Sequence, residues 1–115
     1  IDDAMARWGR IDILHYNVGV SLSAGDQILE GVTEQSFDRV NAINLRGAIF
    51  AAKHVVPIMR KQGSGVILNI GSISAIETTY QLVAYKTSKA GMIALSQPSK
   101  TSMPTPTAMA KMKAM

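Results

Sequence analysis

Cysteine is absent from this sequence, which excludes both a disulfide framework and a thiolate metal site. The absence is compatible with a reducing compartment, and we expect a cytoplasmic location. Long hydrophobic runs are also missing. The longest apolar stretch, residues 47–59, is interrupted by Lys53, His54 and Pro57 and is too short to span a bilayer. We therefore expect no membrane partner.

Acidic residues are missing from the C-terminal segment 98–115, whose three lysines give it a formal charge of +3. The other 97 residues hold nine basic and eight acidic side chains and contribute only +1 to the total of +4. Because the excess rests on three scattered lysines, we predict no nucleic-acid partner. Residues 98–107 are rich in Pro, Ser and Thr, and residues 108–115 are too short for an independent helix, so 98–115 is predicted to be a disordered or weakly helical tail.

A serine, a tyrosine and a lysine form the clearest candidate site. Tyr85 and Lys89 lie four residues apart in segment 81–97, which is predicted to be helical, so their side chains share one face. Ser72 precedes Tyr85 by thirteen residues and follows the apolar run 66–70, a predicted strand. Ligands bind at the carboxyl edge of parallel α/β sheets, and these three side chains could converge there.

These three residue types suit hydride transfer at a carbonyl carbon. A phenol ordinarily titrates near pH ~10, and a nearby ammonium favours the phenolate, which can then exchange protons at neutral pH. A serine hydroxyl can donate a hydrogen bond to an oxygen that becomes an alkoxide. With seven lysines and three tyrosines in the chain, however, a tyrosine four residues before a lysine also arises by chance. An exposed helical pair is the ordinary alternative.

The remaining segments have simple predicted structures. Residues 1–8 are predicted to end a helix at Gly9, and residues 11–17 to form a strand. A long helix is predicted from 34 to 61, with Thr33 as its N-cap. Asn44 stands inside this helix, where it is a poor helix former. His15 has no second candidate ligand nearby, so no metal site is predicted.

Four blocks, in this order, resemble the short-chain dehydrogenase/reductase family: W-G-R-I-D-I-L-x-x-N-x-G, F-D-R-V-x-x-I-N-L-R-G, G-x-V-I-L-N-I-x-S and A-Y-K-T-S-K-A-G-M-I-A-L. The resemblance covers about residues 7–97. It implies an α/β fold, a partial Rossmann-like fragment of a doubly wound parallel sheet with two parallel strands and two long helices. Residues 1–97 would be a partial dinucleotide-binding domain.

The resemblance implies an oxidoreductase that transfers hydride between NAD or NADP and a small-molecule carbonyl or alcohol substrate. By the same resemblance, Tyr85 is the general acid/base, and Lys89 favours its phenolate form and binds the nicotinamide ribose. Ser72 orients the substrate oxygen. Asn44 marks a helix kink and anchors a water-mediated proton relay.

The resemblance also assigns the cofactor contacts: Asn17 and Gly19 would line the cofactor together with Tyr85 and Lys89. Glycine at position 19 would let the backbone approach the cofactor closely. The chain departs from the family pattern just before this point, since His15 and Tyr16 stand where the family usually has Val and Asn.

The family's Gly-rich phosphate loop and its C-terminal substrate region have no counterpart in this sequence. The chain therefore resembles the centre of such an enzyme. The alternative is a truncated, non-catalytic fragment that serves at most as a self-association module. Segments 34–61 and 81–97 match the helices that commonly form the family's dimer interface, so they are candidates for a homo-oligomer contact. With two strands only, we expect both sheet edges to be open and one sheet face to be bare.

Overall fold

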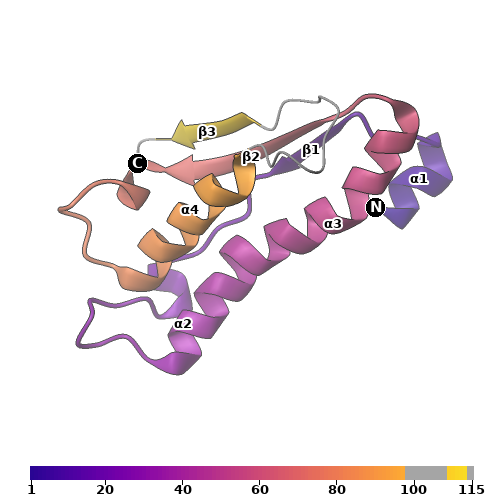
Figure 1. Ribbon diagram of the computed structural model, residues 1–115. Coiled ribbons are helices and arrows are strands. Elements are labelled where there is room, and N and C mark those ends of the chain that lie inside the picture. The colour runs from indigo at the N-terminus through magenta and orange to yellow at the C-terminus, as the bar shows by residue number, and fades with distance from the viewer. Residues whose placement is uncertain (98–108, 114–115) are drawn as a thin grey trace.

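The computed structural model describes residues 1–97 and 109–113, which form a parallel sheet with helices packed on one side (Figure 1). The strands are β1 (Ile13–Tyr16), β2 (Val66–Ser72) and β3 (Met109–Lys113). The α-helices are α1 (Asp2–Trp8), α2 (Glu34–Asn41), α3 (Gly47–Gln62) and α4 (Val83–Ser96). The elements alternate between strand and helix, which confirms the predicted Rossmann-like α/β class.

Strands β1 and β2 are the two parallel strands that the sequence predicts. Ile13 pairs with Val66 and Tyr16 with Asn69, so the two strands end near the same sheet edge. Strand β2 alternates between buried and half-buried residues, whereas β1 alternates between half-buried and exposed ones. Strand β2 therefore forms the centre of the sheet, and its carboxyl end carries Ser72.

Strand β3 corrects the prediction for the C-terminal segment. Residues 109–113 pair in parallel with β2 in the register Leu68–Met109 to Ser72–Lys113. The prediction of a disordered or weakly helical tail is wrong for these five residues. A short isolated helix is marginal in water, whereas the edge of β2 offers backbone donors and acceptors that a further strand satisfies. The linker predicted at 98–107 lies outside the described residues.

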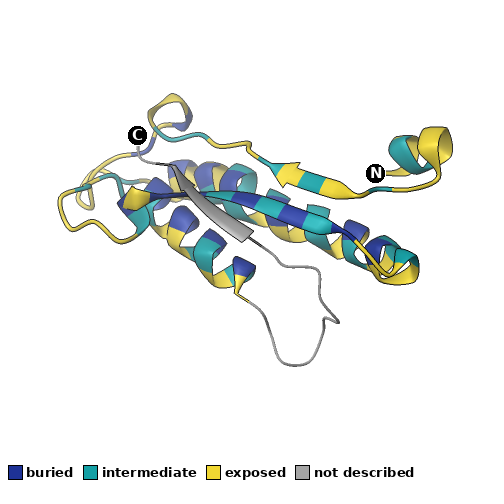
Figure 2. Ribbon diagram, turned by 90° about the horizontal axis from the view of Figure 1, so that it is seen from above, coloured by how far each residue is buried: buried dark blue, intermediate teal, exposed yellow. Residues whose placement is uncertain are grey.

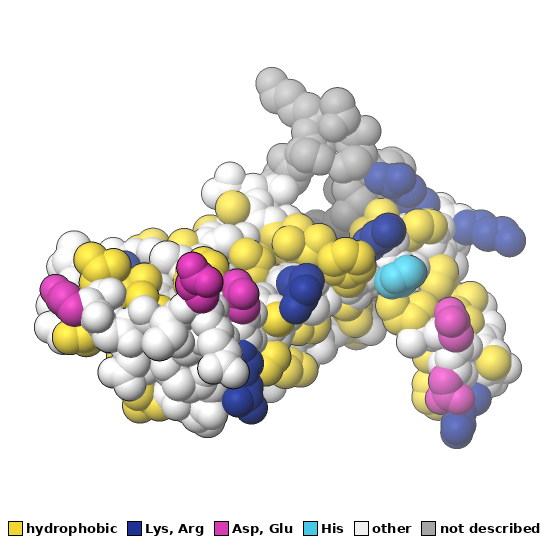
Figure 3. Space-filling model, turned by 90° about the horizontal axis from the view of Figure 1, so that it is seen from below, with side chains coloured by type: hydrophobic (Ala, Val, Ile, Leu, Met, Phe, Trp, Pro, Cys, Tyr) yellow, Lys and Arg dark blue, Asp and Glu magenta, His cyan; other side chains and the backbone are white. Residues whose placement is uncertain are grey.

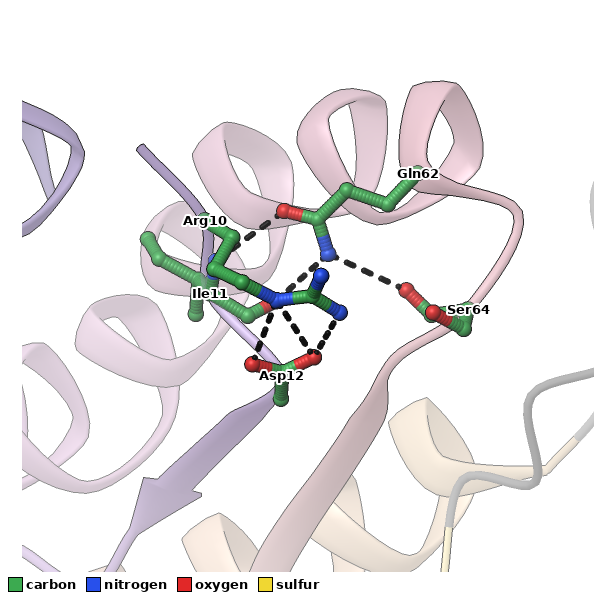
Figure 4. A network of polar contacts seen from close by, with 5 residues as sticks. All are labelled: Arg10, Ile11, Asp12, Gln62 and Ser64. Atoms are coloured by element: carbon green, nitrogen blue, oxygen red, sulfur yellow. Dashed lines mark hydrogen bonds and ion pairs between the residues drawn. The ribbon is translucent and has the colours of Figure 1, made fainter. Parts of the chain in front are cut away.

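The start of β1 is held by a glutamine at the end of α3. Gln62 accepts a hydrogen bond from the Ile11 amide at 3.0 Å and donates one to the Ile11 carbonyl at 2.9 Å (Figure 4). Its amide nitrogen also donates to the Ser64 carbonyl at 3.3 Å. Next to this contact, Arg10 forms an exposed ion pair with Asp12. The Gln62 side chain thus connects the start of β1 with the turn that leads into β2.

The long helix predicted over 34–61 is present but changes its winding in the middle. Thr33 caps α2, as predicted, because its hydroxyl accepts the Ser36 amide at 3.1 Å. Residues Ala42–Arg46 then form a π-helical turn, in which the Gly47 amide bonds to the Ala42 carbonyl. Asn44 lies inside this turn. A single π turn inside an α-helix is often found at functional sites.

The helices cover one face of the sheet. Helices α2, α3 and α4 lie below the strands in Figure 1, as expected when both crossovers run right-handed in one direction. Val55, Met59 and Ile67 form a core cluster between α3 and β2. In Figure 2, seen from above, no described helix lies over the opposite face, and Ile13 and His15 of β1 are exposed. Helix α1 stands apart and buries none of its residues.

Candidate active site

Ser72 ends the central strand and keeps a hydroxyl donor available. Its oxygen accepts two hydrogen bonds, one from the Ser74 amide at 3.2 Å and one from the Ser74 hydroxyl at 2.8 Å. A serine hydroxyl has two acceptor positions and one donor. Since Ser74 uses both acceptor positions, the Ser72 O–H can be donated to another oxygen.

Tyr85 and Lys89 lie on successive turns of α4, and both side chains are buried. The Lys89 ammonium lies 5.6 Å from the centre of the Tyr85 ring, close enough for a cation–π contact. It donates to the carbonyl of Ile70 at 2.8 Å. Ile70 precedes Ser72 by two residues on β2, so this bond links the tyrosine–lysine helix to the strand end that carries the serine.

Burial affects the charge of this lysine. Lys89 is only 4% exposed, and desolvation lowers the pKa of its ammonium from the ordinary value of 10.5. An ammonium in such a site is incompletely hydrated, so hydroxyl oxygens that enter the site are favourable partners for it.

Asn44 is fully buried and joins three segments of the chain. Its side-chain oxygen accepts the Val20 amide at 2.8 Å, and its side-chain nitrogen donates to the Val20 carbonyl at 2.8 Å. The same nitrogen donates to the Ser88 hydroxyl at 3.1 Å, and Ser88 in turn donates to the Tyr85 carbonyl at 2.7 Å. Asn44 therefore connects the π turn, the segment after β1 and helix α4.

Gly19 lies next to both of these polar side chains. A β-carbon added there would be 3.4 Å from Lys89 Nζ and 3.7 Å from Asn44 Oδ1. The structure thus gathers Gly19, Asn44, Tyr85 and Lys89 around one point beside the end of β2. Asn17, the other predicted cofactor contact, lies directly after β1 and is exposed.

Tyr16, which departs from the family pattern, has a specific structural contact. Its hydroxyl donates to the carbonyl of Ile43 in the π turn at 2.5 Å. A β-carbon on Gly47 would lie 2.1 Å from the Tyr16 hydroxyl oxygen, so the glycine leaves room for it. Burial raises the pKa of the Tyr16 phenol above its ordinary value of 10.0. Tyr16 and Gly47 therefore form a matched pair that holds β1 against the π turn.

Asp26 is a residue that the sequence analysis did not identify. It is fully buried in the loop after β1, and its carboxylate accepts the amides of Ala84 at 3.0 Å and Tyr85 at 2.7 Å. It thereby caps the helix that carries Tyr85 and Lys89. No local sequence signal reveals it, because the cap and the helix start are 58 residues apart.

Residues 1–97 and 109–113 offer neither a metal site nor a membrane-spanning helix. No group of three or more His, Cys, Asp or Glu side chains that could hold a metal ion occurs in this part of the chain. Among its helices, none combines the length and the apolar character that crossing a membrane requires.

Comparison with known proteins identifies a family. The sequence profile of short chain dehydrogenases matches residues 1–105. A probable galactose dehydrogenase of Rhizobium meliloti is 39% identical over 98 residues, which are 84% of this chain and 36% of that protein. A 7alpha-hydroxysteroid dehydrogenase of Bacteroides fragilis is 37% identical over 93 residues, 81% of this chain and 36% of that protein.

Solved structures agree with the sequence comparison. The crystal structure of levodione reductase superposes on this chain with a TM-score of 0.77 at 34% identity. The match covers 83% of this chain and 36% of levodione reductase. A short-chain dehydrogenase/reductase from Burkholderia xenovorans has a TM-score of 0.76 at 38% identity. The match covers 83% of this chain and 37% of that protein. The chain thus spans about a third of the length of the relatives it matches.

Proposed function

The chain belongs to the short-chain dehydrogenase family, and on that premise we propose that it carries the catalytic centre of an NAD- or NADP-dependent oxidoreductase. The reaction would interconvert an alcohol and a carbonyl on a small-molecule substrate. One observation supports this most directly: the buried Lys89 ammonium lies over the Tyr85 ring and is bonded to the strand that ends in Ser72.

Tyr85 is the proposed general acid/base. In the oxidation direction its phenolate takes the proton of the substrate hydroxyl, and in reduction its phenol returns that proton to the carbonyl oxygen. The ammonium of Lys89 lies beside its ring. The Ser72 O–H, left available by the two bonds from Ser74, donates to the same substrate oxygen and orients it.

We propose that a dinucleotide binds beside Gly19. Because Gly19 has no β-carbon, a methyl-sized space remains next to Lys89 Nζ and Asn44 Oδ1. One of the three ammonium donors of Lys89 binds the Ile70 carbonyl, and we assign the others to the hydroxyls of the nicotinamide ribose. Asn17 and Gly19 would line the same ligand. When bound, the nicotinamide accepts or supplies the hydride.

Asn44 is the proposed anchor of the proton relay. Its side-chain N–H groups bond to Val20 and Ser88, so its amide serves mainly to fix the surrounding segments. We therefore expect a relay water to bind at the backbone of the π turn.

The predicted cytoplasmic location remains part of this proposal.

Substitution of Tyr85 tests the assignment. Tyr85→Phe should reduce turnover at least ~1,000-fold while leaving the dissociation constants of NADH and NADPH within about threefold, because the variant loses only the hydroxyl group that exchanges the proton. The assay follows the absorbance of the reduced nicotinamide with galactose, a 7α-hydroxysteroid and levodione as the first substrates.

The matched control is Tyr80→Phe. The Tyr80 ring lies 5.7 Å from the Tyr85 ring, so this variant makes the same chemical change beside the proposed centre. It should keep turnover within a few-fold of wild type. Wild-type turnover in the Tyr85 variant would refute the general acid/base role.

A second candidate function is a non-catalytic self-association module. Phe37, Ile49 and Phe50 are exposed on α2 and α3, and Figure 3 shows hydrophobic side chains across this side of the molecule with charged ones between them. Titration with NADH and NADPH, combined with analytical ultracentrifugation, separates the two candidates. Saturable binding at micromolar cofactor supports the enzyme, whereas dimerisation without any cofactor binding supports the module.

A further inference from the structure

The first turn of α4 has all of its free amides bonded to two consecutive loop residues. Four N–H groups at the start of an α-helix, those of the N-cap and of the first three helical residues, have no partner within the helix. Here the Val83 amide donates to the Gln27 carbonyl at 3.0 Å, and the next two amides, of Ala84 and Tyr85, donate to the Asp26 carboxylate. The helix start is thus fixed at three successive residues by residues 26 and 27.

The carboxylate is itself held in place by its own loop. Besides the two helix amides, Asp26 accepts the Gln27 amide at 2.9 Å and the Ser21 hydroxyl at 3.2 Å. All four partners are donors, and each carboxylate oxygen accepts two hydrogen bonds. A buried carboxylate with both oxygens engaged in this way has a fixed position.

The loop around Asp26 rests on two helices. Ala24 packs in a buried cluster with Val40 of α2 and Ala84 of α4. Gly25 ends the short 3₁₀ turn Leu22–Ala24 in a left-handed conformation, with φ of 83°. The loop that carries the Asp26 carboxylate is therefore held in place between α2 and α4.

We propose that Asp26 is a positioning residue that sets the place of the Tyr85 phenol for proton transfer; this rests on the proposed function, in which Tyr85 is the acid/base. Tyr85 is the third residue of α4, and its own amide bonds to Asp26 at 2.7 Å. Loss of this bond frees the backbone that carries the phenol. Lys89 lies one turn further along the helix, is bonded to Ile70 and is held independently of Asp26.

The geometry predicts a selective effect on the chemical step. A reacting group displaced by about 1 Å can lose roughly 100-fold in rate. Cofactor affinity should change little, because Asp26 bonds to neither Lys89 nor Gly19, and the Lys89 side chain has its own anchor at the Ile70 carbonyl. Loss of the Asp26 cap should therefore lower kcat and leave cofactor binding nearly intact.

Asp26→Asn in the full chain is the test. The amide keeps the size of the side chain, but its NH₂ group replaces one acceptor and faces a helix N–H. We expect kcat to fall about 10- to 100-fold, with the dissociation constants of NADH and NADPH within about threefold. Hydrogen exchange at the Ala84 and Tyr85 amides, followed by NMR, should accelerate at least tenfold.

Two further variants make the test specific. Ser21→Ala keeps the carboxylate and removes one of its partners, so it should change kcat in the same direction by about two- to fivefold. Thr33→Ala removes a cap of the same kind from α2 and should leave kcat and the two α4 amides unchanged. If Asp26→Asn keeps wild-type kcat, or if Thr33→Ala lowers kcat equally, the positioning role is refuted.

The exchange measurement also separates this proposal from the proposed function. If the wild-type chain turns over no substrate, the enzyme assignment fails. The Tyr85 amide and the NMR signal of its ring still report whether Asp26 fixes this residue, independently of activity. Unchanged exchange and an unchanged ring signal in Asp26→Asn would overturn the positioning role even in an active enzyme.

Discussion

Helix α2 is capped by residues at its own start, whereas helix α4 is capped from a loop 58 residues away. At α2, Thr33 and Ser36 exchange bonds in a capping box, with the Thr33 amide donating to the Ser36 hydroxyl at 3.2 Å. At α4 the N-cap residue, Leu82, provides no side-chain bond, and Asp26 takes its place. The α2 box satisfies the amides of Thr33 and Ser36, and the α4 cap satisfies those of Ala84 and Tyr85.

The two caps differ in what they control. Thr33 is exposed and its capping box involves only its own turn, so this cap affects the stability of one helix end. The Asp26 cap is fully buried and connects a loop to the helix that carries the proposed acid/base. A cap from a distant segment therefore stabilises the fold and also fixes the relative position of two parts of the site.

The largest difference between the two caps should appear in stability. Asp26→Ala leaves two buried amides without acceptors, which should cost about 3 kcal/mol. Thr33→Ala should cost about 1 kcal/mol, because water reaches the exposed helix start. Urea unfolding followed by circular dichroism measures both free energies of unfolding. Equal losses of unfolding free energy in the two variants would show that the buried Asp26 cap stabilises the protein no more than the local Thr33 cap does.

The same contrast explains how much of the structure could be predicted. The Thr33 cap, the helix end at Gly9 and the strand that ends in Ser72 depend on neighbouring residues, and the sequence indicates each of them. Asp26 leaves no such signal, because its partners are defined only by the tertiary fold. Strand β3 was missed for the same reason: its partner is the edge of β2, and its own residues show no preference that decides the matter.

Gly47 provides a second test, in which local helix propensity and a contact with a distant residue predict opposite changes in stability. Helix propensity alone predicts that Gly47→Ala stabilises α3 by about 1 kcal/mol. The contact with Tyr16 predicts the opposite, because the new methyl group would collide with the phenol oxygen. We expect a net loss of about 2 kcal/mol in the free energy of unfolding.

A double-mutant cycle with Tyr16→Phe identifies the cause of this loss. Removal of the phenol oxygen should itself cost about 1 kcal/mol, since the Ile43 carbonyl loses its partner. In that background Gly47→Ala should cost much less, with a coupling energy of about 1–2 kcal/mol. Additive losses would mean that the glycine is required by something other than Tyr16.

The smallest effect concerns charge, where the two helices also differ: Arg39 of α2 is exposed, whereas Lys89 of α4 is buried. Because burial lowers the pKa of Lys89 below 10.5, the unfolded chain binds more protons than the folded one between the lowered value and 10.5. Stability gains a contribution from Lys89 as pH rises through this window. Below the window the full cost of burying the ammonium opposes folding.

Lys89→Met should remove this contribution. The difference in unfolding free energy between wild type and variant should shift in favour of wild type as the pH rises through this window. Tyr16, whose pKa is raised above 10.0, contributes the opposite slope, but it is present in both proteins and cancels in the difference. Lys86→Met on the same helix is the control and should follow the wild-type pH dependence. If Lys89→Met also followed the wild-type pH dependence, the ammonium would be better solvated than its position between Tyr85 and Ile70 indicates. Incomplete hydration could then not explain why Lys89 binds further hydroxyl groups, and hydrogen-bond geometry alone would have to explain it.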